Sequence, residues 1–264
     1  MRYKVPLIAS VLWKIGRTSR SIPLLKRTWP SILKRVIPLL WGSKEKIITT
    51  EVGVFSLNIT RYVERLIAFY GDYEHKQVDY LLSAMKKSKA DVFFDIGANI
   101  GYYTIAAATR AEPGKIIAFE PDQRSIKQIK LNLQLSGISD KVEVVGSAAS
   151  DKTGKVEFNL TGDSSPASSW VGSGENSIIV DSVALDDFYD FKDKCLFMKI
   201  DIEGHELSAL KGMDRLLKNN KVFMQLECFN ENLPATLPVM EELGFTMVNE
   251  MGWDRYFTNF DLPV

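Results

Sequence analysis

A short loop of glycines and one acid is the segment of this 264-residue chain best suited to bind a ligand. It reads Asp95-Ile-Gly-Ala-Asn-Ile-Gly101, and it stands where the apolar run VFFDI gives way to a helical pattern. Glycine lets the backbone approach a ligand closely, and such a turn lies at the carboxyl edge of a parallel sheet, where α/β folds bind their ligands. We therefore predict that Asp95, Gly97, Asn99 and Gly101 contact a ligand.

A second acid, Glu120, ends the run IIAFE nineteen positions after Gly101. An acid at the end of the second strand of such a fold can accept hydrogen bonds from both hydroxyls of a ribose. Asp95 and Glu120 could each be an ordinary strand-end residue, but the pair with the glycine loop between them predicts a nucleoside-binding site. The loop departs from the dinucleotide fingerprint, because Asn99 stands where G-x-G-x-x-G requires its second glycine.

The segment Asp201-Ile-Glu-Gly-His-Glu206 brings acids and one of the two histidines to the same predicted edge, after the apolar run CLFMKI. His205 is a candidate to take a proton from a substrate hydroxyl, since the pKa of a free histidine is roughly 6.5. Asp201 is a candidate to orient substrate or cofactor. We predict both as catalytic residues; a helix-start histidine bonded to the backbone is the alternative for His205.

Apolar runs alternate with amphipathic ones along most of the chain, which predicts a mostly parallel sheet covered on both faces. The expected strands are 92–96, 115–120, 142–147, 195–201 and 222–227, and the expected helices are about 101–110, 124–136 and 203–217. The runs GFTMVNE and DRYFTN predict an antiparallel hairpin that closes the sheet. The fold class is therefore α/β and Rossmann-like.

Three parts of the chain differ in composition. Residues 1–45 form a basic arm that contains Trp13, Trp29 and Trp41, residues 46–90 predict a lead-in hairpin and helix, and residues 91–264 predict the catalytic domain. Because the arm is amphipathic, we expect it to pack its apolar face against the catalytic body or a second subunit, or to contact a membrane surface peripherally.

The charges of the chain balance at 33 basic and 33 acidic residues, which predicts no nucleic-acid partner. Residues 1–46 hold 11 of the basic residues and a single acid, which leaves 22 basic against 32 acidic residues in the body. Cys195 and Cys228 lie in apolar runs without a C-x-x-C pair, and the first apolar stretch is too short to span a bilayer. We expect a soluble, cytoplasmic protein.

With these residues assembled, the chain resembles the FkbM family of methyltransferases. The resemblance rests on FFDIGANIGYYT, AFEPD, VVGSAASDKTGKVEF, ALDDF, MKIDIEGHELSALKG and QLE, which follow one another across roughly residues 92–260. It implies a seven-stranded methyltransferase sheet and transfer of a methyl group from S-adenosylmethionine. The acceptor that the resemblance implies is a hydroxyl of a sugar, a glycan or a polyketide-like small molecule.

The resemblance also implies roles for individual residues. Cofactor binding maps onto Asp95, Gly97, Asn99, Gly101 and Glu120. Asp95 is expected to contact the ammonium group of the cofactor, and the two glycines are expected to leave room for its methionyl and ribose portions. By analogy with the wider fold, Ser147 and Ala148 lie near the adenine, and Asp201 lies near the methyl-bearing sulfur.

Three other functions remain open on the sequence alone. Asp201 and Glu227, at the ends of adjacent predicted strands, could hold Mg²⁺ in a metal-assisted O-methyltransferase, although no third carboxylate is obvious. The second is a non-catalytic scaffold that uses the arm to contact a membrane or partner. A nicotinamide dehydrogenase is the third, and Asn99 and the terminal hairpin count against it.

The identity of the acceptor is the least readable property of the sequence. We expect specificity to reside in the Ser/Gly-rich stretch 161–176, in the terminal hairpin and in the arm. Trp170 or Trp253 could stack on the face of a sugar, and either could equally be a packing residue.

Overall fold

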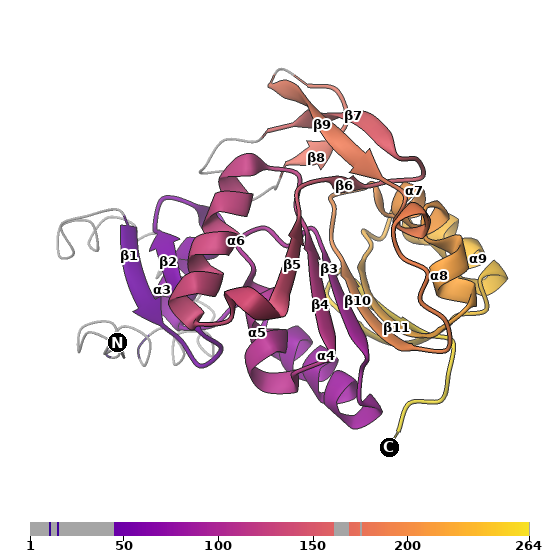
Figure 1. Cartoon of the computed structure of the whole chain (residues 1–264), viewed down its shortest axis with the longest axis horizontal. Helices are drawn as coiled ribbons and strands as arrows, with labels where there is room; N and C mark the ends of the chain where they lie inside the picture. Colours follow the sequence, from indigo (N-terminus) through magenta and orange to yellow (C-terminus); the bar gives the residue numbers. More distant parts are fainter. Residues whose placement is uncertain (1–10, 12–14, 16–44, 161–168, 175, 264) are drawn as a thin grey trace.

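The structure is a computed structural model that describes residues 45–160, 169–174 and 176–263, together with residues 11 and 15. The predicted arm therefore lies almost wholly outside the described residues, as does the segment 161–168. Within the described part, the strands form a two-stranded, a four-stranded and a seven-stranded sheet (Figure 1).

The seven-stranded sheet has the order β12-β13-β11-β10-β3-β4-β5. Its strands are β3 (Val92–Ile96), β4 (Lys115–Phe119), β5 (Val142–Val145), β10 (Cys195–Ile200), β11 (Lys221–Glu227), β12 (Thr246–Met251) and β13 (Asp254–Thr258). The five strands from β11 to β5 run parallel, whereas β13 lies between β11 and β12 and is antiparallel to both. This confirms the predicted α/β class and the antiparallel closing hairpin.

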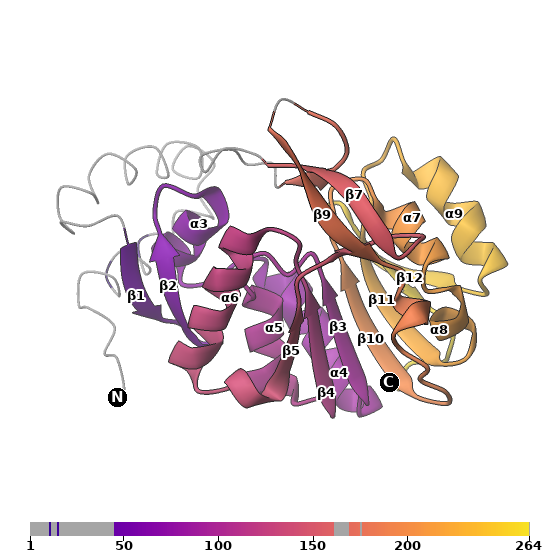
Figure 2. The ribbon, with the colours of Figure 1, turned by 45° about the horizontal axis from the view of Figure 1, so that its top comes forward.

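Helices cover both faces of this sheet, and successive residues of one strand show why. Phe93 faces a core that includes α4 (His75–Ser88), α5 (Tyr102–Ala106) and α6 (Gln123–Ser136). Phe94 faces a second core that includes α7 (Glu206–Lys211), α8 (Asp214–Lys218) and α9 (Leu233–Glu242). Because side chains alternate along a strand, a fully apolar strand must be buried on both sides, and Figure 2 shows the two helical layers.

The lead-in segment forms the predicted hairpin and packs onto the same core. Its elements are β1 (Glu45–Thr49), β2 (Val54–Asn58) and α3 (Tyr62–Tyr70), followed by α4. Two side chains of α6 hold β2: Asn132 accepts from the backbone N–H of Ser56 at 2.9 Å, and Ser136 accepts from that of Val54 at 3.0 Å. The segment thus shares a core with the sheet, while the boundary at residue 90 stays a prediction.

Two predicted elements differ in the structure. The helix expected over 203–217 is split into α7 and α8 around Gly212, where a Cβ atom would lie 1.9 Å from the carbonyl oxygen of Ser150. The chain therefore bends where the backbone of another segment presses on it. The helix expected over 101–110 is α5 followed by a π-helical turn, Ala107–Ala111.

The third predicted strand is also shorter than expected, because β5 ends at Val145 and the chain then leaves the central sheet. It enters a four-stranded sheet of order β6-β9-β7-β8, made of β6 (Ala148–Ala149), β7 (Gly154–Asn159), β8 (Trp170–Val171) and β9 (Ser177–Val183). Ser147 lies at the crossing between the two sheets. None of the helices in the described part of the chain has the length and apolarity needed to cross a bilayer.

Candidate functional site

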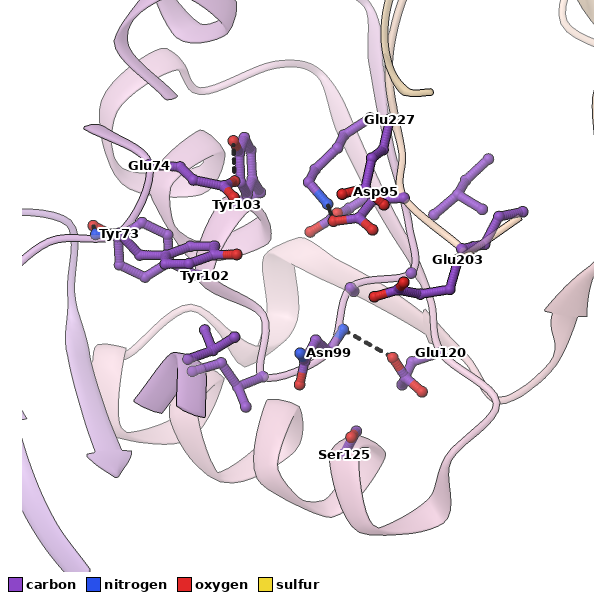
Figure 3. Close-up of a pocket in the computed structure, with 18 of the residues that line it drawn as sticks. Tyr73, Glu74, Asp95, Asn99, Tyr102, Tyr103, Glu120, Ser125, Glu203 and Glu227 are labelled. Carbon is purple, nitrogen blue, oxygen red and sulfur yellow. Dashed lines mark hydrogen bonds and ion pairs between the residues drawn. The ribbon is translucent and has the colours of Figure 1, made fainter. Parts of the chain in front are cut away.

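A cavity of about 1570 Å³ lies at the carboxyl ends of β3, β4, β10 and β11. Residues from the lead-in segment, from the loops after these strands and from the four-stranded sheet all line it. Figure 3 shows Asn99 and Glu120 toward one end and Asp95 and Glu227 toward the other. The predicted residues that line the cavity are Asp95, Gly97, Asn99, Glu120, Ser147, Ala148 and Asp201.

Glu120 is fixed by the backbone of two neighbouring loops. Its Oε2 accepts a hydrogen bond from the N–H of Asn99 at 2.8 Å, and its Oε1 accepts one from the N–H of Asp122 at 2.8 Å. Burial raises the pKa of Glu120 to about 8, although these two N–H groups act in the opposite direction. Each carboxylate oxygen has a second acceptor position, so Glu120 can still accept hydrogen bonds from two hydroxyl groups while both N–H groups are bound.

Asp95 is buried at the end of β3 and is only half satisfied. Its Oδ2 accepts a hydrogen bond from the hydroxyl of Thr104 at 2.5 Å, whereas its Oδ1 has no hydrogen-bond partner among the described residues. Burial raises the pKa of Asp95, and the ammonium of Lys199 acts against this. A buried oxygen without a partner beside a cavity fits a ligand that donates a hydrogen bond.

The structure gives each of the two loop glycines a local packing reason. A Cβ atom on Gly97, whose φ is +84°, would lie 1.9 Å from the carbonyl oxygen of Asp201, so this glycine makes room for another loop, and Gly97 also lines the cavity. Gly101, with a φ of +80°, precedes α5; a Cβ atom there would point at Ile129, and Gly101 does not line the cavity. Both positions need a left-handed backbone, which favours glycine.

Lys199 is a site residue that the sequence analysis missed. It is buried in β10 opposite Asp95, and its Nζ lies 2.8 Å from Oδ2 of Asp201 and 4.8 Å from the ring centre of Tyr103. Burial lowers the pKa of Lys199, but the carboxylates of Asp201, Asp95 and Glu74 outweigh it and raise the pKa above its ordinary value. A lysine inside the apolar run CLFMKI was the available signal, because a buried lysine requires an acidic partner.

Three carboxylates meet where β10 and β11 end. One oxygen from each of Asp201, Glu203 and Glu227 lies within 4.8 Å of the others, so Glu203 is the third carboxylate that was not obvious from the sequence. Burial would raise the pKa of Asp201, but the Lys199 ammonium outweighs it and holds the pKa below its ordinary value. Burial and the charge of Asp201 raise the pKa of Glu227. The pKa values of these two neighbouring carboxyl groups are thus shifted in opposite directions.

His205 is not among the residues that line the cavity. Its Nε2 lies 2.9 Å from the hydroxyl oxygen of Ser150, which follows β6, and burial lowers the pKa of the imidazole. His205 thus lies near the predicted edge, but its ring contacts the segment that follows β6 and not the cavity. Its role as a base stays a prediction that this position does not favour.

Two aromatic residues form part of the cavity wall beside the carboxylates. The rings of Phe229 and Trp253 lie edge to face with their centres 5.0 Å apart, and both residues line the cavity. Trp253 is 58% exposed in the turn between β12 and β13. Trp170 is not a lining residue, although its neighbours Ser169 and Val171 are; residues 161–168 lie outside the described part.

The lead-in segment supplies a wall that the sequence analysis did not assign to the site (Figure 3). The hydroxyl of Tyr103 donates to Glu74 at 2.9 Å and accepts from the side-chain amide of Gln225 at 3.1 Å. The backbone N–H of Tyr73 donates to the hydroxyl of Tyr102 at 3.1 Å. These bonds fix the α3–α4 loop against the central sheet.

The chain is similar in sequence to a known methyltransferase and, more distantly, to solved structures. Over 228 residues the chain is 24% identical to the hexuronic acid methyltransferase AglP of Haloferax volcanii, which covers 85% of this chain and 93% of that protein. An O-methyltransferase from Bacillus cereus in complex with SAH has 15% identity and a TM-score of 0.45, over 71% of this chain and 81% of that one. TYW2 of M. jannaschii in complex with AdoMet has 12% identity and a TM-score of 0.43, over 82% and 84%.

The family assignment rests on a match over more than half of the chain. The model of the methyltransferase FkbM domain matches residues 95–247. This span begins at Asp95 and includes Glu120, Lys199, Asp201 and Glu227, and so takes in most of the loops at the strand ends. The chain belongs to the FkbM family of methyltransferases.

Proposed function

We propose that the protein transfers a methyl group from S-adenosylmethionine to a hydroxyl oxygen of a sugar, a glycan or a polyketide-like molecule. The observation that carries this proposal is the placement of Asp95 and Glu120 in one cavity at the carboxyl edge of the parallel strands. The name of the Haloferax volcanii relative supports a sugar acceptor.

The lining residues fit this cofactor. The partnerless Oδ1 of Asp95 is suited to the ammonium group of the methionyl portion, and the open acceptor positions of Glu120 are suited to the two ribose hydroxyls. Ser147 and Ala148 line the part of the cavity proposed for the adenine. Bound there, the cofactor supplies an electrophilic methyl group.

The residues of the chain contribute alignment and a place for the proton. The acceptor oxygen must lie in line with the sulfur–methyl bond that breaks. The main task of the protein is therefore to hold both reactants in this alignment and to exclude water. As the new O–C bond forms, the hydroxyl loses its proton. Asp201 lines the cavity and its Oδ2 lies 2.8 Å from Nζ of Lys199, whereas His205 does not line the cavity, so we assign Asp201 the role of proton acceptor in place of His205.

Isothermal titration of the purified protein with S-adenosylmethionine, with its demethylated product and with NAD tests this proposal. We expect micromolar binding of the first two and no heat from NAD. Absence of binding by both would favour the scaffold function, and binding of NAD alone would favour a dehydrogenase.

A metal-assisted reaction is a second candidate, because Asp201, Glu203 and Glu227 provide three clustered oxygen ligands. Hard cations such as Mg²⁺ prefer such ligands. Lys199 already pairs with Asp201, so one of the three is partly neutralised without a metal. Turnover that is lost on addition of EDTA and restored by Mg²⁺ would favour this candidate; turnover indifferent to both would favour the metal-free reaction.

A further inference from the structure

We propose that the acceptor is an uncharged carbohydrate ring, stacked on Trp253 and hydrogen-bonded to the carboxyl groups at the ends of β10 and β11. This inference rests on the proposed function and goes further, because it separates neutral sugars from uronic acids.

The aromatic pair supplies a surface for the apolar face of a ring. Trp253 is 58% exposed although it packs against Phe229, and it lies in a two-residue turn anchored where the N–H of Cys228 donates to its carbonyl oxygen at 2.9 Å. An exposed tryptophan at a cavity wall keeps a large flat face available to a ligand. The anchored backbone limits how far this face can move.

Polar groups next to this surface match the hydroxyls of a sugar. Asp201, Glu203 and Glu227 line the cavity, and one oxygen from each lies within 4.8 Å of the others, so several hydrogen-bond acceptors meet at one place. The Oε2 atom of Glu227 is buried and has no hydrogen-bond partner among the described residues. An apolar face beside several clustered acceptors suits a polyol ring, which presents several hydroxyl donors, better than a flat aromatic hydroxyl.

Charge at this end of the cavity disfavours an acidic acceptor. The lysine there, Lys199, is paired with Asp201 at 2.8 Å. Arg255, on the neighbouring hairpin, does not line the cavity; its guanidinium donates to the carbonyl oxygen of Gly252 at 2.7 Å and to Asn230 at 2.8 Å. A uronate carboxylate beside Asp201 and Glu203 would therefore meet a lysine that is already paired, and like charges repel at close range.

The test uses S-adenosylmethionine with a tritiated methyl group and four acceptor pools. These are 4-nitrophenyl glycosides of neutral hexoses, those of deoxyhexoses, those of hexuronic acids, and catechol as a flat aromatic hydroxyl. We expect label in one of the neutral pools, with kcat/KM at least about tenfold above that for the hexuronides. Equal or greater labelling of hexuronides, label in catechol alone, or no label in any glycoside would overturn the proposal.

A pair of variants tests the stacking surface itself. Trp253→Ala should raise the KM for the labelled glycoside about tenfold, Trp253→Phe should recover part of the loss, and both should keep the affinity for S-adenosylmethionine within about twofold. The control is Phe188→Ala, because Phe188 is 61% exposed but does not line the cavity. An equal change of KM in Trp253→Ala and Phe188→Ala would overturn the proposed stacking of the acceptor on Trp253. Failure of the wild-type protein to bind S-adenosylmethionine would instead count against the proposed function.

Discussion

The two ends of the cavity are built in different ways. At the ends of β3 and β4, backbone groups set the geometry: the N–H groups of Asn99 and Asp122 hold Glu120, and the carbonyl of Asp201 fixes Gly97. At the ends of β10 and β11, side chains such as Trp253 form the surface. Where backbone groups set the geometry of a site, most side-chain substitutions leave that geometry unchanged. Where side chains form the surface, a single substitution can change what the site binds.

The largest expected effect is at Gly97, and it tests whether the first end depends on the backbone. Gly97→Ala places a methyl group 1.9 Å from the Asp201 carbonyl oxygen at a positive φ, so we expect a loss of about 3 kcal/mol or more of unfolding free energy. Urea unfolding measures it. Gly137→Ala is the matched control, because Gly137 has a φ of +71° but open space around it; its cost should be only about 1 kcal/mol.

Removal of the Glu120 carboxylate is next in size. Glu120→Ala should weaken binding of S-adenosylmethionine by about 1 to 3 kcal/mol, roughly 5- to 150-fold, because the ribose hydroxyls and two backbone N–H groups lose their acceptor. Isothermal titration gives the affinity. Glu143→Ala, outside the cavity lining, should leave it unchanged. An unchanged affinity in Glu120→Ala would refute the assignment to the ribose.

The raised pKa of Glu120 allows the same assignment to be tested through the pH dependence of cofactor affinity. The ionised carboxylate is the better hydrogen-bond acceptor, and Glu120 loses its proton near pH 8. Below pH 8, the affinity for S-adenosylmethionine should therefore increase with pH, by up to about tenfold for each pH unit, and it should level off above pH 8. The ammonium group of the cofactor titrates in a similar range, so the quantity to compare is the ratio of affinities of the wild type and Glu120→Gln. A ratio independent of pH between about 6 and 9 would contradict the expectation.

The smallest effect is expected at His205, where a catalytic and a positioning role give different results. His205→Ala and Ser150→Ala should each lower the unfolding free energy by about 1 kcal/mol, because they remove the same contact of 2.9 Å. In a double-mutant cycle the two losses should not add. A fall in kcat of about 100-fold or more in His205→Ala alone would instead restore the histidine as the general base.

Much of the fold was predictable because it rests on period and order along the chain. The alternation that defines β3, β4, β10 and β11 is local, and the runs GFTMVNE and DRYFTN likewise indicate the closing hairpin. The break at Gly212 was not predictable, because it depends on the carbonyl of Ser150, which is distant in the sequence. The strand β9 was not predicted either, since it follows directly after the Ser/Gly-rich stretch.

The residues of the site likewise fall into those that the local sequence indicates and those that depend on contacts between distant segments. Asp95 and Glu120 were found because strand ends and loops are visible in the sequence, and both line the cavity. Lys199, Glu203 and the tyrosines of the lead-in wall were missed, because their role depends on which strands and helices become neighbours. His205 failed for a related reason: the sequence places it near the edge but does not show toward which sheet its ring turns.

The position of β13 within the sheet also determines when the part of the cavity wall that carries Trp253 can form during synthesis. β12 has β13 as its sheet neighbour, and β13 pairs with β11 as well, so β12 cannot join the sheet until residues 254–258 have left the ribosome. The turn that carries Trp253 joins these two strands. A chain cut short before Asp254 would leave the edge of β11 open and β12 unpaired, with Asp95 and Glu120 already synthesised. The part of the cavity that we propose selects the acceptor is thus the last to be completed.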